Sequence, residues 1–124
     1  EDNAFMILKN KTVTASLHVS ATQWKNLFSF EIFGDKGFLT IDGKGGSYGK
    51  ETLVFGKRKP EFGVPRIKTF EFARDTSWED EWKNFLNVLN KKAKMIGAPE
   101  DGLRANRIIE AIYTSSKNKR SLKL

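Results

Sequence analysis

The sequence predicts an α+β fold: an open-faced, mostly antiparallel β-sheet of about six strands, with two C-terminal helices packed on one face. Up to residue 72, apolar and polar residues mostly alternate, which is the two-residue period of β-strands. From residue 78 onward, apolar residues recur three or four positions apart, as on one face of a helix. Helices that follow a run of antiparallel strands are typical of the α+β class.

The first two strands are expected to form a hairpin. Residues 4–8 are apolar on both faces, which indicates a strand that is covered on both sides. Residues 12–20 alternate between apolar and polar side chains, so this strand has one buried face. Asn10 and Lys11 lie between the two runs and suit a tight turn.

Four further strands are expected before the helices, over residues 26–33, 38–42, 51–55 and 66–72. Residues 34–37 form the turn between the first two of them. Residues 43–49 contain four glycines in seven positions, so they predict a loop. Residues 57–65 are charged and carry two prolines, which predicts a loop or a sheet edge.

The first helix is expected to run from Ser77 to Lys94 and to stop before Gly97. Thr76 and Glu79 have the spacing of a capping box. The apolar stripe of this helix consists of Trp78, Trp82, Phe85, Leu86 and Leu89, and we interpret both tryptophans as core residues.

The second helix is expected to begin at Pro99, a residue favoured in the first turn. Its expected buried stripe consists of Ala105, Ile108, Ile109, Ile112 and Ser116. The tail over residues 121–124 alternates and suits an additional edge strand. Because two helices cannot cover both faces of the sheet, we expect its second face to meet another subunit.

Composition restricts the possible functions. The 124 residues correspond to one domain. There is no cysteine and only one histidine, His18, which excludes thiolate and His-rich metal sites and suits the reducing cytoplasm. No apolar run has the length of about 20 residues that a membrane-spanning helix needs.

The net charge of +7 leaves two interpretations open. Lysines and arginines gather at residues 91–94 and 117–123. A basic module that binds nucleic acid or another polyanion is one interpretation. Lysines that face the negative ends of helix dipoles are the other. We favour the second, because the clusters contain no aromatic residues on which bases stack.

The segment Trp24-Lys25-Asn26 is a candidate ligand site. An aromatic ring beside an amide and a cation suits a polyhydroxylated ligand, because the ring packs on C–H faces while the polar groups bind hydroxyls. Trp24 is equally well interpreted as an ordinary core or edge anchor. The backbone amides of the glycine-rich loop and Lys44 suit an anion, although a plain mobile connection is the favoured interpretation. We interpret His18 as a solvated or interface residue rather than a catalytic one.

Three motifs resemble the C-terminal domain of the Gfo/Idh/MocA family of oxidoreductases. The first four residues, EDNA, look like the family's E-D-x-A entry to a long strand. Residues 31–39, EIFGDKGFL, look like its E-I-x-G-x-x-G-x-L hairpin. Residues 101–105, DGLRA, followed by the serine-rich end at 113–116, look like its closing helix.

The resemblance implies a single C-terminal substrate-binding and oligomerisation domain over residues 1–124, whose N-terminal Rossmann domain is absent from this chain. Family members use NAD or NADP and act on a sugar, a cyclitol or a related polyol. The family's proton-handling lysine and its Asp-x-x-x-His pair have no counterpart here, so we assign no catalytic, cofactor-binding or metal-binding residue. We therefore expect this chain alone to be inactive, and to form a homo-dimer or tetramer through the open sheet face.

The resemblance also bears on the ligand site. In inositol dehydrogenase-like members, an aromatic residue that contacts the substrate lies just before the E-I-x-G hairpin. Trp24, Lys25 and Asn26 occupy that stretch here, and Tyr48 of the glycine-rich loop looks like a feature of some sugar oxidoreductases. These four residues are the predicted substrate contacts.

Overall fold

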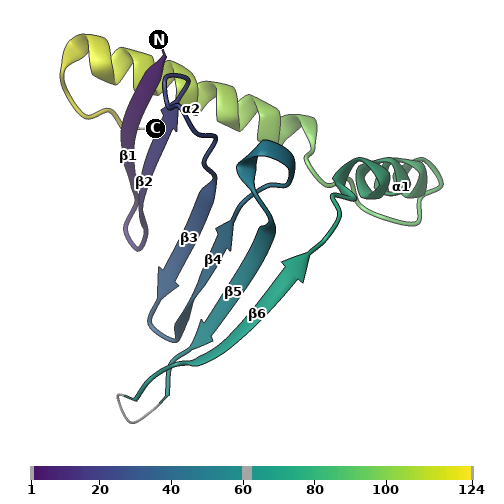
Figure 1. Ribbon diagram of the computed structural model, residues 1–124. Coiled ribbons are helices and arrows are strands. Elements are labelled where there is room, and N and C mark those ends of the chain that lie inside the picture. The colour runs from purple at the N-terminus through teal and green to yellow at the C-terminus, as the bar shows by residue number, and fades with distance from the viewer. Residues whose placement is uncertain (1, 60–62, 124) are drawn as a thin grey trace. The chain divides into compact units, whose positions relative to one another are not determined.

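The computed structural model describes residues 2–59 and 63–123 (Figure 1). These residues form six antiparallel strands followed by two α-helices, which confirms the predicted α+β class. The strands make two sheets, β1-β2 and β3-β4-β5-β6. The chain divides into two compact units, Glu1–Thr22 with Trp78–Leu124, and Gln23–Ser77. In chain order the elements are β1 (Asn3–Lys9), β2 (Thr14–Ser20), β3 (Ser29–Gly34), β4 (Gly37–Asp42), the 3₁₀ turn η1 (Gly46–Tyr48), β5 (Glu51–Lys57), β6 (Arg66–Phe72), α1 (Ser77–Leu89) and α2 (Pro99–Asn118).

The hairpin of β1 and β2 has the predicted pairing but a longer turn. Lys9 pairs with Thr14, so residues 10–13 form the connection. The side-chain oxygen of Asn10 accepts hydrogen bonds from the backbone N–H groups of Thr12 and Val13, at 2.8 and 2.7 Å. This local capping by an asparagine side chain explains why the turn forms without glycine.

Helix α1 ends at Leu89, five residues before the predicted end at Lys94. Lys91 has a left-handed φ of 57°, which no helix residue adopts. The N–H of Lys91 bonds to the carbonyl of Val88, and the N–H of Lys92 bonds to that of Asn87. This pair of bonds is the Schellman arrangement that closes a helix, and it usually has glycine at the left-handed position.

The interpretation of the two α1 tryptophans as core residues is wrong for the described chain. Trp78 is 81% exposed and Trp82 is 61% exposed. Trp82 stacks on Phe85 with ring centroids 5.5 Å apart. Helical spacing shows that apolar side chains share a face, but it does not supply a surface that covers them, and no large apolar side chain of the described residues is fully buried.

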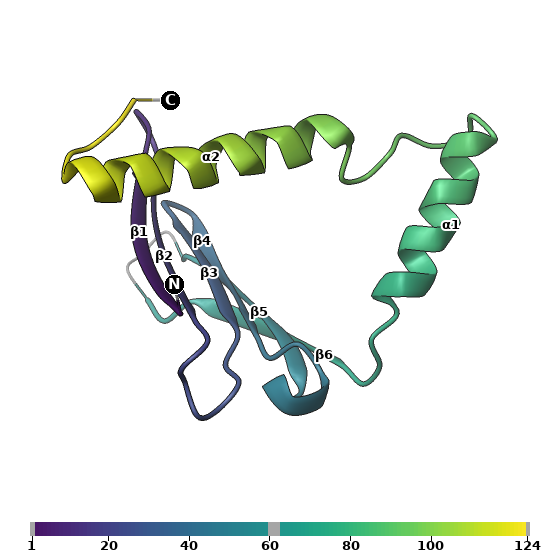
Figure 2. The same ribbon diagram turned by 90° about the horizontal axis from the view of Figure 1, so that it is seen from above.

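Helix α2 begins at Pro99, as predicted, and the carboxylate of Asp101 accepts a hydrogen bond from the N–H of Ala98. The C-terminal half of α2 lies beside β1 (Figures 1 and 2). The residues that α2 turns toward β1 are Ile108, Ala111, Ile112, Ser115 and Ser116. The predicted buried stripe is therefore confirmed at Ile108 and Ile112, which are half-buried, whereas Ser116 lines the hollow beside β1 but is exposed. Ala105 is exposed as well, and Ile109 is 49% exposed.

The tail after α2 differs from its prediction in the part that the structure describes. Residues 121–123 form no strand, and Leu124 lies outside the described residues. Ser121 and Leu122 instead line the groove beside β1. Glu1 and residues 60–62 of the predicted second loop also lie outside the described residues.

The second unit contains a four-stranded meander (Figure 1). The two faces of this sheet differ in chemistry. The pairing register places eight large apolar residues on one face: Phe30, Ile32, Leu39, Ile41, Leu53, Phe55, Phe70 and Phe72. The other face is polar toward one end of the strands, with Glu31, Thr40 and Glu71. At its opposite end this second face carries apolar residues, among them Phe33 and Phe38, whose ring centroids lie 5.9 Å apart.

Candidate functional site

The glycine-rich loop, residues 43–49, connects β4 to β5 and closes on itself. The N–H of Gly45 bonds to the carbonyl of Gly49 at 2.9 Å, and the N–H of Tyr48 bonds to that of Gly45 at 3.1 Å. Between them, residues 46–48 make the short 3₁₀ turn η1. The prediction of a loop is confirmed, and the loop has a defined backbone shape.

Gly43 attaches the glycine-rich loop to the strand-entry segment, residues 23–28. Its N–H donates to the carbonyl of Phe28 at 3.0 Å. It is one of the few buried residues in the described chain, and its φ is 76°. A Cβ at this position would lie 2.2 Å from the carbonyl oxygen of Lys50. Only glycine fits this backbone contact.

Two side-chain contacts join the same two segments. The Nδ2 group of Asn26 donates a hydrogen bond to the Oγ of Ser47 at 2.7 Å, across 21 residues of sequence. The Nζ of Lys44 lies 5.7 Å from the centroid of the Phe28 ring, within the range of a cation–π interaction. Together with the Gly43 bond, these contacts tie the loop to residues 26–28 at three points.

The structure places the four predicted substrate contacts on these two segments. Asn26 contacts the loop that carries Tyr48, and Tyr48 is 43% exposed. Trp24 is fully exposed, with a relative exposure of 106%, so it is not a core anchor in this chain. Lys25 beside it is also exposed. An exposed indole, an amide and a cation are therefore all open to solvent at one edge of the unit.

A hollow of about 380 Å³ lies between the glycine-rich loop and the segment after β6. The loop, Lys50 and Glu51 line one side, and residues 72–75 line the other. Lys50 forms an ion pair with Glu71. The pKa of Asp75 is lowered from its ordinary value of 3.8 by hydrogen bonds from the side chain and the backbone of Ser77, with a smaller contribution from the positive charge of Lys44. Lys44 thus interacts with both Phe28 and Asp75.

The glycine-rich loop does not fit a dinucleotide cofactor. A pyrophosphate cradle requires that a glycine-rich turn open directly into the N-terminus of a helix. This loop contains only the three-residue turn η1 and leads into β5. In the described residues no group of three or more histidine, cysteine or acidic side chains is arranged to hold a metal ion. The arrangement suits the binding of hydroxyl groups, with the indole as a stacking surface.

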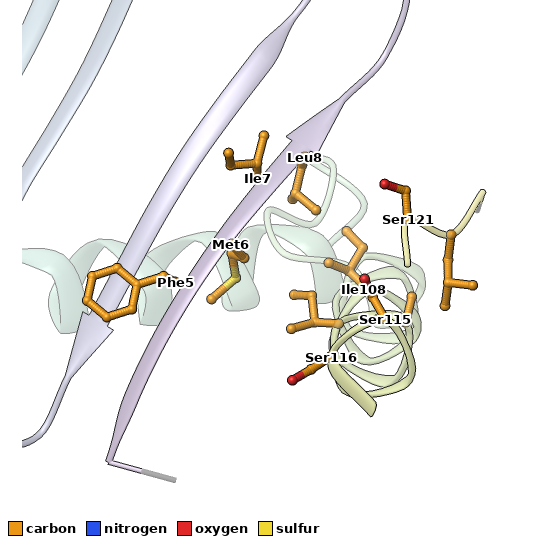
Figure 3. A pocket seen from close by; sticks show the side chains of 11 residues that line it. Phe5, Met6, Ile7, Leu8, Ile108, Ser115, Ser116 and Ser121 are labelled. Carbon is orange, nitrogen blue, oxygen red and sulfur yellow. The ribbon is translucent and has the colours of Figure 1, made fainter. Parts of the chain in front are cut away.

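A second hollow, of about 330 Å³, lies between β1 and α2 in the first unit (Figure 3). Figure 3 shows residues of β1 on one side and Ile108, Ser115 and Ser116 of α2 on the other. Its lining side chains are apolar apart from three serines, and the Oγ of Ser115 donates to the carbonyl of Arg120 at 2.7 Å. No ionisable side chain lines it, so it offers packing rather than chemistry.

His18 is exposed and stacks on its cross-strand neighbour Phe5, with ring centroids 4.1 Å apart and planes 8° apart. This exposure agrees with the interpretation of His18 as a solvated or interface residue.

Sequence reasoning missed Ser47 and the structural role of Gly43. The cluster of glycines correctly indicated a loop. The spacing of apolar residues along the chain, however, does not indicate which distant side chain will form a hydrogen bond with a serine hydroxyl. The pairing of Asn26 with Ser47 depends on the register of β3 and β4, which brings the two ends of that hairpin together.

The described chain thus combines six antiparallel strands with two helices, and the unit formed by residues 23–77 exposes an aromatic side chain and an amide side chain, Trp24 and Asn26. The chain matches, over residues 1–124, the model of the Gfo/Idh/MocA C-terminal domain, described as oxidoreductase family, C-terminal alpha/beta domain. The chain belongs to this oxidoreductase family. No curated protein and no solved structure was found to match it. No helix in the described parts of the chain is long and apolar enough to cross a membrane.

Proposed function

We propose that this chain is the substrate-contacting and oligomerisation domain of an NAD(P)-dependent oxidoreductase that acts on a sugar, a cyclitol or a related polyol. Family membership supports the reaction class. The observation that carries the substrate assignment is the hydrogen bond between Asn26 and Ser47, because it joins the aromatic and amide segment to the loop that carries Tyr48.

In this proposal each predicted contact has a distinct role. The exposed ring of Trp24 packs on the C–H face of the substrate, since a flat apolar surface complements the axial hydrogens of a sugar ring. Asn26 and Tyr48 exchange hydrogen bonds with hydroxyl groups, and Lys25 donates to a hydroxyl or to an anionic substituent. The nicotinamide cofactor binds to an N-terminal Rossmann domain, a partner that the family resemblance implies, and hydride transfer takes place beside it.

Binding of myo-inositol, D-glucose and D-gluconate to the chain, measured by calorimetry, tests the substrate assignment. We expect one of these polyols to bind. Trp24→Ala should weaken its binding about tenfold because the stacking surface is lost, and Asn26→Ala should weaken it about tenfold because a hydrogen bond to the ligand is lost. Trp78→Ala is the matched control, because Trp78 is also an exposed tryptophan but lies in the other unit. Binding that survives Trp24→Ala and Asn26→Ala unchanged would contradict the assignment.

The chain by itself is expected to give no turnover when NAD or NADP is added with the bound polyol, because its glycine-rich loop lacks the helix that a pyrophosphate needs. Formation of reduced cofactor by the purified chain would contradict this expectation. The same Trp24 and Asn26 substitutions in the protein with its Rossmann domain should raise KM for the polyol and leave KM for the cofactor unchanged.

The assembly part of the proposal is a homo-dimer or tetramer formed through the sheet face that carries Phe33. Phe33 is 70% exposed, and Phe38 stacks beside it on the same face. Light scattering should show an oligomer that Phe33→Glu dissociates, because a buried carboxylate at an apolar interface is costly. Val64→Glu is the control, since Val64 is 77% exposed and lies outside every strand.

A further inference from the structure

We infer that Ser47 is a positioning residue that orients the carboxamide of Asn26 for two substrate hydroxyls. The inference rests on the proposed function, because it concerns the same polyol site. It adds to that site a residue that none of the sequence motifs identified.

The positioning role of Ser47 follows from the hydrogen-bond donors and acceptors that the side chains of Asn26 and Ser47 offer. The Nδ2 group of Asn26 has two N–H bonds, and one of them donates to the Oγ of Ser47 at 2.7 Å. In the described chain Asn26 and Ser47 make no other hydrogen bond. The second N–H and the Oδ1 of Asn26 therefore remain available, and so does the O–H of Ser47. Two donors and one acceptor match two neighbouring hydroxyl groups, each of which can donate and accept.

The loop can hold Ser47 in place because its backbone is constrained independently of this hydrogen bond. Gly43 bonds to the carbonyl of Phe28, and Tyr48 bonds to the carbonyl of Gly45 within the loop itself. The Lys44 ammonium group adds a contact to the Phe28 ring. Ser47 consequently approaches Asn26 from a fixed position, and the amide is ordered before a substrate arrives. Ordering a side chain in advance reduces the entropy lost on binding.

The test uses the side-chain amide signals of Asn26 in ¹⁵N-correlated NMR spectra, together with titration of myo-inositol. Without ligand, Ser47→Ala should shift both Asn26 amide signals and narrow the difference between them, whereas Ser47→Thr, which keeps the hydroxyl, should restore them. Ser16→Ala is the control, because Ser16 is an exposed serine of β2 and belongs to the other unit.

On titration, Ser47→Ala should weaken myo-inositol binding about three- to tenfold, the range for one net hydrogen bond, and Ser47→Thr should restore it. In the Asn26→Ala background, Ser47→Ala should have a much smaller effect, because the group that it orients is gone.

The outcomes separate the two proposals. If the protein binds myo-inositol and Ser47→Ala binds it equally well, the positioning role is wrong while the proposed function stands. Unchanged Asn26 signals in Ser47→Ala would also overturn the positioning role. If the wild-type chain binds neither myo-inositol, D-glucose nor D-gluconate, the substrate assignment fails, and the role of Ser47 fails with it.

Discussion

The glycine-rich loop and the C-terminal ends of the two helices both take the backbone to positive φ, but they do so with different residues. In the loop the positions are glycines, with φ of 76° at Gly43 and 83° at Gly49. At the helix ends they are lysines, with φ of 57° at Lys91 and 51° at Lys119. Positive φ alone therefore does not explain where this chain requires glycine.

Two physical differences separate these regions. Gly49 has a ψ of 176°, in a region of backbone space that essentially only glycine adopts, whereas Lys119 has a ψ of 38° and lies in the ordinary left-handed helical region. Gly43 adds a steric constraint, because a Cβ there would meet the backbone of Lys50. The helix ends show that a left-handed lysine is tolerated when the position is exposed and ψ is favourable.

The largest expected effect comes from Gly43→Ala. The methyl group would meet the Lys50 carbonyl oxygen at 2.2 Å in a backbone conformation that is already unfavourable. We expect the free energy of unfolding to fall by roughly 2–4 kcal/mol in urea titrations. The contact of Asn26 with Ser47 should be lost as well. Gly34→Ala is the control, since its Cβ would approach nothing closer than 3.8 Å. If Gly34→Ala lowered the free energy of unfolding as much as Gly43→Ala, a steric clash at Gly43 would not explain why glycine is required there.

Gly49→Ala separates the conformational constraint from the steric one. A Cβ at Gly49 would meet nothing within 4 Å, so only the backbone conformation opposes it. The expected loss in the free energy of unfolding is about 1–2 kcal/mol. Gly102→Ala inside α2 also has open space around its Cβ and should stabilise the chain by about 0.5–1 kcal/mol, because alanine favours helices. A stabilising Gly49→Ala would show that the loop relaxes.

Lys119→Gly tests whether the left-handed lysine at the C-terminal end of α2 is strained. Glycine removes the strain of a left-handed residue with a Cβ while keeping the Schellman bonds from residues 119 and 120. We expect a gain of about 0.5–1 kcal/mol in the free energy of unfolding. Lys117→Gly, two positions earlier in α2, should instead lower it by about 1 kcal/mol. If both substitutions destabilise, the left-handed lysine carries no strain.

The smallest expected effect is the change in the free energy of unfolding at acid pH. It should come from Asp75, which lines the hollow beside the glycine-rich loop. The pKa of Asp75 is lowered, so its ionised form stabilises the folded state at and above the ordinary value of 3.8, and this contribution is lost as pH falls through the lower folded pKa. Asp75→Asn should flatten the dependence of stability on pH below that value. An unchanged pH profile in Asp75→Asn would contradict the shift.

Much of the local structure was predictable because it depends on neighbouring residues. Apolar patterns and turn residues correctly indicated all six strands, and Pro99 correctly marked the start of α2. The helix ends were less predictable: α1 stops early at a lysine in a conformation that usually belongs to glycine. Nothing in the local composition distinguishes Lys91 from the other lysines around it.

The candidate site was predictable only in part. Trp24 and Asn26 stood out by their chemistry and by a family motif, and Trp24 is indeed open to solvent. Whether Trp24, Lys25, Asn26 and Tyr48 contact a substrate stays a prediction. Ser47 had no signal in the sequence, because its contact with Asn26 depends on strand pairing that spans 21 residues.

The amino-acid sequence by itself determined the elements of this protein, since periodicity and turn chemistry act between residues a few positions apart. It also determined family membership, since the family model matches the sequence over residues 1–124. Only the tertiary structure decided how the strands divide between two sheets, which glycine is sterically required, and which serine meets Asn26. These features depend on distances between residues that are far apart in the chain, and on the space left between backbones once the strands have paired.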